Sequence, residues 1–209
     1  MVRGQKVTYG MFKAVVLAFN SVRLVPHVLV LLGSSRRDVF WADMARWAEV
    51  YQLGPSDSVS KRIRLFVHLM AFYQEFRNLY YLRVGWPGRL FALLCRPVAT
   101  LRIEADRIGP GLFIQHGFGT WITAEEIGDN CWINQQVTIG WANGLSGRPS
   151  IGNNVTIAVG AKILGSLRLG DGSKVGANSV VIMDVPPGVT VMGVPATALW
   201  GSKVSSKRG

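Results

Sequence analysis

The sequence is short of acidic residues, of cysteine and of long apolar runs, and each shortage excludes a class of protein. Only 12 of its 209 residues are Asp or Glu, against 23 Lys and Arg, so the formal net charge is +11. Charged residues make up 17% and apolar residues 49%, which excludes a disordered chain and allows a sizeable core. Two cysteines, Cys95 and Cys131, are too few for a disulfide framework and lack zinc spacing, so we expect free thiols.

No segment has the roughly 18 to 20 uninterrupted apolar residues that a membrane-spanning helix needs. The most apolar early stretch, residues 15–32, is interrupted by Asn20, Arg23, Pro26 and His27. It also begins too late and lacks the small-residue cleavage site of a signal peptide. We therefore expect a cytoplasmic protein.

The positive charge is concentrated in the first half of the chain. Residues 1–100 hold 14 Lys and Arg against 5 Asp and Glu, whereas residues 101–209 hold 9 against 7. A basic surface can attract nucleic acid, anionic lipid or an anionic substrate, or can simply aid solubility. No zinc finger, ribonucleoprotein motif or Gly-rich basic tail is present, so we expect no nucleic-acid partner. Peripheral association with the inner face of the membrane, an anionic ligand and plain solubility stay open.

The second half is a repeat in which every sixth residue is aliphatic, with two interruptions. The positions are Ile108, Ile114, Ile127, Ile133, Ile139, Ile151, Ile157, Ile163, Leu169, Val175 and Val181. This period predicts a left-handed parallel β-helix, in which three hexads close one coil and the aliphatic residues stack inside it. A β-sandwich would instead show alternation and spacings of about 8 to 12 residues. The fold class is therefore mainly β with an α part.

One interruption of the repeat is an insertion. Twelve residues instead of six separate Ile139 from Ile151, and the added stretch is rich in Gly. Such an insertion has to leave the coil as a loop. Loops that project from a solenoid are frequent binding sites.

The first half has helical periodicity. A helix is predicted to start at Asp38, and a second apolar pattern with spacings of three and four runs over residues 65–80. Gly and Pro mark breaks at residues 54–57 and 86–88, and a last helix is expected over about 87–96. We expect a helical domain over residues 1–98, the β-helix over 99–199 and a basic tail over 200–209.

Five segments of the coil resemble the serine acetyltransferase pattern: residues 112–119, 157–165, 175–181, 185–188 and 193–196. The resemblance covers about residues 101–199. Within it, the chain looks most similar to O-acetyltransferases of bacterial capsular and exopolysaccharides. The resemblance implies acetyl transfer from acetyl-CoA to a hydroxyl, without a metal. It also implies a homotrimer, free or paired with a second trimer, with active sites between neighbouring coils.

His116 matches the catalytic histidine of that family. A histidine of near-neutral pKa can take the proton of an alcohol as the alcohol attacks the thioester, so no covalent enzyme intermediate is required. Backbone N–H groups at a coil corner can stabilise the oxyanion. A carboxylate has to orient the imidazole, and the candidates are Glu104, Asp106, Glu125 and Glu126, of which Glu125 is our first choice.

The resemblance also has departures that concern the acceptor. The family's ammonium-binding Asp, directly before the histidine, is Gln115 here, a second Asp is Leu101, and a second His is Arg148. Loss of a charged clamp argues against free serine and favours a neutral sugar. We expect Gln115, Trp141, Asn143 and Arg148 to bind the acceptor, and for Arg148 a salt bridge of its loop stays open as the alternative.

The resemblance further places the pantetheine of CoA in a groove between coils, beside small residues. The matching positions, with basic residues for the phosphates, are Gly140, Ala158, Ala161, Lys174, Gly176, Ala177 and Lys203.

The sequence analysis therefore predicts acetyl-CoA-dependent O-acetylation of a sugar hydroxyl in capsule or exopolysaccharide synthesis. One alternative is a serine O-acetyltransferase or another small-molecule (xenobiotic) acetyltransferase. The other is a non-catalytic scaffold on a degenerate coil, which would bind no CoA and would tolerate the loss of His116.

Overall fold

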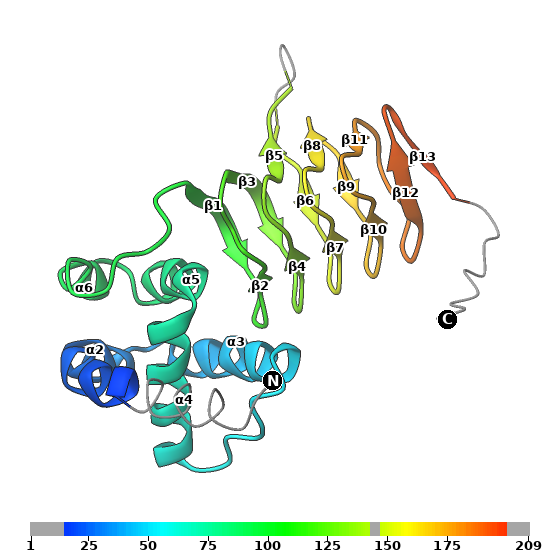
Figure 1. The fold of residues 1–209 in the computed structure, drawn as a ribbon. Coiled ribbons are helices and arrows are strands. Elements are labelled where there is room, and N and C mark those ends of the chain that lie inside the picture. The colour runs from blue at the N-terminus through cyan, green and yellow to red at the C-terminus, as the bar shows by residue number, and fades with distance from the viewer. Residues whose placement is uncertain (1–14, 143–146, 200–209) are drawn as a thin grey trace, which may run out of the picture. The chain divides into compact units, whose positions relative to one another are not determined.

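The computed structural model describes residues 15–142 and 147–199 (Figure 1). The chain divides into two compact units between Leu101 and Arg102. The predicted basic tail lies outside the described residues, as does Lys203. The predicted domain limits of 98/99 and 199/200 stay predictions.

The first unit is helical. Its described helices are Val15–Arg23, α2 (Val25–Gly33), α3 (Arg37–Val50), α4 (Val59–Phe72), α5 (Gln74–Val84) and α6 (Trp86–Arg89). The apolar pattern over residues 65–80 spans two helices, because the extended backbone of Tyr73 (φ −121°, ψ 103°) separates them. The expected break at 86–88 is present but falls one residue earlier, at Gly85 with φ of 71°, since Pro87 stands in the first turn of α6, where proline fits a helix. Helix α6 ends at Arg89, short of the expected residue 96, and the chain continues in turns.

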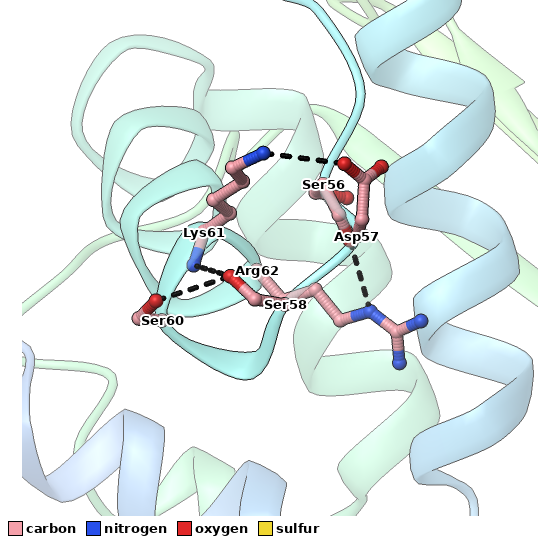
Figure 2. Close-up of polar contacts among 6 residues, drawn as sticks. All are labelled: Ser56, Asp57, Ser58, Ser60, Lys61 and Arg62. Carbon is pink, nitrogen blue, oxygen red and sulfur yellow. Dashed lines mark hydrogen bonds and ion pairs between the residues drawn. The ribbon is translucent and has the colours of Figure 1, made fainter.

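The start of α4 shows how the local sequence sets a helix boundary (Figure 2). Ser58 caps the helix by accepting a hydrogen bond from the Lys61 backbone N–H at 3.3 Å. The Lys61 ammonium lies 3.2 Å from the Asp57 carboxylate, and the Arg62 guanidinium donates to the Ser56 carbonyl at 3.2 Å. These contacts fix the loop between α3 and α4.

Aromatic side chains form the core of the helical unit, with Phe40, Trp47, Phe66, Phe76 and Tyr80 fully buried. A buried ion pair crosses this core from α3 to α5. The Arg83 guanidinium donates to both carboxylate oxygens of Asp43, at 2.8 and 3.1 Å. Two bonds of this kind satisfy charges that burial would otherwise destabilise.

The second unit is the predicted solenoid of short parallel strands (Figure 1). Its strands are β1 (Leu101–Ile108), β2 (Phe113–Ile114), β3 (Thr120–Ile127), β4 (Trp132–Ile133), β5 (Thr138–Gly140), β6 (Ser150–Ile151), β7 (Thr156–Ile157), β8 (Lys162–Leu164), β9 (Arg168–Leu169), β10 (Lys174–Val175), β11 (Val180–Val181), β12 (Thr190–Gly193) and β13 (Ala196–Ala198). One sheet stacks β2, β4, β7, β10 and β12, and the other stacks the remaining rungs against β3. β13 turns back antiparallel on β12.

The predicted aliphatic ladder lies inside this coil. From Ile114 to Val181 every predicted ladder residue is buried, with at most 2% of its surface exposed. The registers pair Ile114 with Ile133, Ile133 with Ile157, and Ile157 with Val175. The period of six therefore predicted the coil correctly from Ile114 onward.

The first irregular step of the repeat has a structural cause that the period of six could not reveal. Ile122 is also buried and pairs with Ile139, so eight residues separate Ile114 from Ile122, whereas six separate Ile133 from Ile139. The first coil therefore has two additional residues at the corner between β2 and β3. His116 lies in this corner.

Among the described residues, no single helix is both long and apolar enough to cross a membrane. The helices Val15–Arg23 and Val25–Gly33 meet that criterion only when taken together, and they are bent by 56° relative to each other.

His27, in α2, is fully buried against three aromatic rings. Its Nε2 lies 3.0 Å from the Tyr81 hydroxyl, which donates to the Cys95 carbonyl at 2.7 Å. Burial disfavours the charged imidazolium and lowers the pKa of His27 from 6.5 to about 4.

The lowered pKa of His27 predicts a pH-dependent stability of the helical unit. The unfolded chain binds a proton near pH 6.5 that the folded unit binds only near pH 4, so stability falls as the pH falls through this window. Acidification from pH 7 to pH 5 is expected to cost about 2 kcal/mol through this group. Urea unfolding at both pH values measures the loss, which His27→Gln should reduce. His116→Asn, which changes an exposed histidine, is the control and should lose as much stability as the wild type. If His27→Gln also lost as much stability as the wild type between pH 7 and pH 5, His27 would not be the group responsible.

Candidate functional site

His116 lies on an exposed corner of the coil that we call the histidine corner. It consists of the turns that follow β2, β4, β7 and β10, namely residues 115–119, 134–136, 158–160 and 176–178. His116 and Gly117 both have left-handed backbone, with φ of 65° and 62°. The Phe118 N–H donates to the His116 carbonyl at 2.8 Å and so closes the turn. A non-glycine residue in this conformation costs free energy that the turn has to offset.

The His116 side chain points into solvent and has no hydrogen-bond partner within residues 15–142 and 147–199. This sets it apart from His27, which is buried in the helical core, and from His68, whose ring packs 4.9 Å from that of Phe72. An exposed imidazole without an internal partner is available to exchange a proton with a bound molecule.

The histidine corner also gathers several of the predicted donor-binding residues. Ala158 and Gly176 occupy equivalent positions in neighbouring coils, and the N–H of each donates to a carbonyl in the next coil, at 3.0 and 2.8 Å. Gln115, which was predicted to bind the acceptor, occupies the same position two coils before Ala158, with Asn134 in the coil between them. Ala177 is exposed one residue further on. The small side chains of Ala158, Gly176 and Ala177 leave room for an extended chain to lie close to the coil in these two turns.

The other predicted donor-binding residues differ in their placement. Lys174 is exposed on β10 and forms no ion pair with any described residue, so its charge is available to a phosphate. The Ala161 side chain lies inside the coil and is fully buried, and its carbonyl accepts from the Thr138 N–H at 2.9 Å. Ala161 therefore presents neither its side chain nor that carbonyl to a ligand. Gly140 is buried at the end of β5.

A second corner, which we call the loop corner, lies between β5 and β6 and carries the inserted loop. It holds Trp141, which is 58% exposed, and Arg148, whose guanidinium forms an ion pair with Asp106 of β1. Asn143 lies outside the described residues. Glu125 is exposed where β3 passes this corner, and its carboxylate accepts from the Ser150 hydroxyl at 3.3 Å.

Glu125 and His116 therefore belong to different corners of one chain, and the described residues show no contact between them. The role of Glu125 as the carboxylate that orients His116 stays a prediction. The sequence analysis missed the pairing of Asp106 with Arg148, because 42 residues separate the two. Only the stacking of β1 on β3 brings the two charges together.

The two thiols are poor candidates for nucleophiles. Burial raises the pKa of Cys131 to about 11 and also raises that of Cys95, so both are protonated near neutral pH. The Cys131 Sγ lies 3.1 Å from the Gly152 carbonyl inside the coil. Within the described parts of the chain, no three His, Cys, Asp or Glu side chains are grouped so that they could hold a metal ion.

Comparisons with known proteins agree with this architecture. Residues 148–182 match the family model "Bacterial transferase hexapeptide (six repeats)". A serine acetyltransferase of Helicobacter pylori is 36% identical over 137 residues, which cover 64% of this chain and 80% of that protein. One from Synechococcus elongatus is 40% identical over 130 residues, which cover 60% of this chain but only 53% of the relative. The chain thus spans about half the length of that relative.

The solved structures include a similar protein with a bound ligand. The Neisseria gonorrhoeae serine acetyltransferase in complex with serine superimposes with a TM-score of 0.62 and is 25% identical. The match covers 88% of this chain and 82% of that one, so it includes part of the helical unit as well as the coil.

These relatives overturn the prediction of a capsular or exopolysaccharide acetyltransferase that acts on a sugar. The similar proteins are named serine acetyltransferases at 36 to 42% identity. The error came from Gln115, Leu101 and Arg148, which we took to show that a charged clamp had been lost. In the structure Arg148 pairs with the Asp106 carboxylate, and Asp106 is not one of these three positions.

Proposed function

This chain belongs to the serine acetyltransferase family of hexapeptide-repeat proteins, and we propose that it transfers the acetyl group of acetyl-CoA to the hydroxyl of serine. The observation that carries the proposal is the exposed imidazole of His116 on the histidine corner, which has no hydrogen-bond partner among the described residues. A second observation, the charge pair of Arg148 and Asp106, favours an amino-acid acceptor.

Arg148 and Asp106 together offer one charge of each sign to a ligand. Serine is a zwitterion at neutral pH, so its carboxylate can bind the Arg148 guanidinium while its ammonium binds the Asp106 carboxylate. Both partners are accessible, since 25% of the Arg148 side chain and 65% of the Asp106 side chain are exposed. In the proposed complex the ligand inserts between two charges that otherwise pair with each other.

His116 acts as the general base in this proposal. Its imidazole takes the hydroxyl proton of serine while the serine oxygen attacks the thioester carbonyl, which forms a tetrahedral oxyanion. The oxyanion collapses, the carbon–sulfur bond breaks, and the CoA sulfur receives the proton back from the imidazolium. The products are O-acetylserine and CoA, and His116 returns to its neutral form.

The residues of the histidine corner fit acetyl-CoA as the donor. The small side chains of Ala158, Gly176 and Ala177 allow a narrow pantetheine arm to lie close to the coil, next to His116. The exposed ammonium of Lys174 is one candidate for binding the phosphates.

The two corners imply that a complete site needs a second copy of the chain. His116 and Arg148 lie on different corners of one coil, so the base of one chain would meet the clamp of its neighbour. We propose a homotrimer, in which each pair of neighbouring coils forms one site, because a closed ring of three copies gives every base a clamp.

His116→Asn is expected to lower kcat by about 100-fold to 10,000-fold, since removal of a general base has effects of this size. Asparagine suits the left-handed corner, as Asn130, Asn154 and Asn178 adopt φ of 55° at other corners, so the melting temperature should not fall. Release of CoA thiol in the presence of serine measures the rate. His68→Gln, in the helical unit, is the control. Full activity in His116→Asn, or failure of the wild type to bind acetyl-CoA, would favour the non-catalytic scaffold.

Arg148→Ala and Asp106→Asn are each expected to raise the KM for serine by about tenfold or more and to leave the KM for acetyl-CoA nearly unchanged. The matched control is Arg107→Ala, which breaks an exposed 2.7 Å ion pair with Glu126 one residue further along β1. Surface pairs of this kind contribute little, so the control should keep wild-type constants. Equal effects at Arg107 and Arg148 would contradict the clamp.

Co-expression of His116→Asn with Arg148→Ala tests the shared site. Random mixed trimers are expected to recover about a quarter of the wild-type rate at saturating acetyl-CoA and low serine, because about one interface in four combines both intact residues. Each variant purified alone gives the baseline. If the mixed preparation is no more active than the two variants measured separately and added together, the complete site lies within one chain.

A further inference from the structure

Asn134, in the turn after β4, has a side chain that the coil itself does not require. Its backbone lies outside the left-handed region, whereas Asn130, Asn154 and Asn178 adopt φ of 55° at other corners, where asparagine is favoured. Alanine occupies the same position in the next coil, at residue 158. The carboxamide of Asn134 is therefore needed neither for the turn nor for the packing of the coil.

Trp132 fixes the orientation of this carboxamide. Its indole N–H donates to the Asn134 Oδ1 at 2.8 Å, and its ring packs edge-on against the Phe113 ring with 4.8 Å between the centroids. An indole N–H is only a donor, so Asn134 has to present its oxygen to Trp132 and its nitrogen away from it. Asn134 is partly exposed, and no residue within 15–142 and 147–199 accepts a hydrogen bond from its Nδ2.

Asn134 lies between the proposed base and the donor-binding turns. Gln115, next to His116, is in the first coil, and the equivalent positions of the second, third and fourth coils are Asn134, Ala158 and Gly176. The proposed acetyl-CoA has its thioester at the first coil and its pantetheine arm along the third and fourth. The arm therefore has to pass the second coil at Asn134.

The backbone along this path is already hydrogen-bonded within the coil. The N–H groups of Asn134, Ala158 and Gly176 donate to carbonyls of the next coil at 3.0, 3.0 and 2.8 Å. The side chains of Ala158 and Gly176 have no polar atom. In the second coil, by contrast, the Asn134 Nδ2 supplies a donor that an amide of the arm can use.

The length of the arm agrees with the spacing of the coils. In acetyl-CoA, five bonds separate the thioester carbon from the carbonyl carbon of the nearest amide, which is about 6 Å in an extended chain. Neighbouring coils are about 4.8 Å apart. A thioester at His116 therefore places this amide at the second coil, where Asn134 lies.

We propose that the Asn134 Nδ2 donates a hydrogen bond to the carbonyl oxygen of the pantetheine amide nearest the thioester. The bond fixes how far the arm reaches along the coil, and with it the distance between the thioester and His116. Trp132 is a positioning residue that acts through Asn134. The inference rests on the proposed use of acetyl-CoA and does not depend on the identity of the acceptor.

Calorimetric titration with CoA tests this bond without any acceptor. Asn134→Ala should raise the Kd for CoA about three- to tenfold, as expected for the loss of one hydrogen bond. Its melting temperature should stay unchanged, because alanine fits the equivalent position at residue 158. Asn134→Asp keeps an acceptor for Trp132 and loses both donors, so it should weaken CoA at least as much. The KM for serine should stay nearly the same in both variants.

Truncated donors identify the group that Asn134 binds. S-acetyl-N-acetylcysteamine keeps the amide nearest the thioester, whereas S-butyl thioacetate lacks it. Asn134→Ala should lower kcat/KM about three- to tenfold with acetyl-CoA and with S-acetyl-N-acetylcysteamine, and should leave it unchanged with S-butyl thioacetate. An equal loss with S-butyl thioacetate would overturn the proposal, because Asn134 would then act on the thioester itself.

Trp132→Phe tests the positioning role, since it keeps a ring against Phe113 and removes the indole N–H. It should raise the Kd for CoA about two- to threefold in the wild type and should have no effect in Asn134→Ala. The matched control is Trp121→Phe, which removes an indole bond of the same kind, from Nε1 to the Thr123 hydroxyl at 3.0 Å. The control should bind CoA as the wild type does.

Two results of the titrations would overturn the proposal. Asn134→Ala could bind CoA as tightly as the wild type, or Trp132→Phe could weaken CoA equally with and without Asn134. A wild type that binds CoA but does not acetylate serine would overturn the proposed acceptor alone, because the titrations need no acceptor. A wild type that binds no CoA would overturn both proposals.

Discussion

The aliphatic ladder inside the coil is the constraint on which the rest of the second unit depends. Each rung is too short to be stable alone, and only the stacking of Ile133 on Ile114 and Ile157 on Ile133 buries a continuous core. The ladder fixes which side chains point outward and at which corner each turn falls. Corner residues can therefore vary in chemistry, since the packing that holds them lies elsewhere.

The corners are where this coil departs from a uniform solenoid, and both departures carry candidate function. Two additional residues project His116 from the histidine corner, and six additional residues form the loop that precedes Arg148. Neither insertion disturbs the ladder, because the coil resumes its register at Ile122 and Ile151. A rigid scaffold with variable corners can position a base and a clamp without itself changing.

The helical unit follows a different physical logic. Its core is aromatic and includes a buried ion pair and a buried neutral histidine, so its interior demands specific partners and not only apolar surface. At the same time it leaves large apolar side chains such as Phe19, Trp86 and Leu93 exposed. This combination is typical of a unit with an additional partner, whereas the coil hides most of its aliphatic residues.

The sequence alone determined the fold of the second unit and the residue that stands out in it. A period of six needs no tertiary information, because it reports a local geometry repeated along the chain, and His116 interrupts that period. The helix starting near Asp38 was predictable for the same reason. Tertiary structure decided how residues distant in sequence are placed. It pairs Asp106 with Arg148, separates Glu125 from His116, and buries Ala161 inside the coil. These depend on how coils stack and where corners fall, which no local pattern encodes.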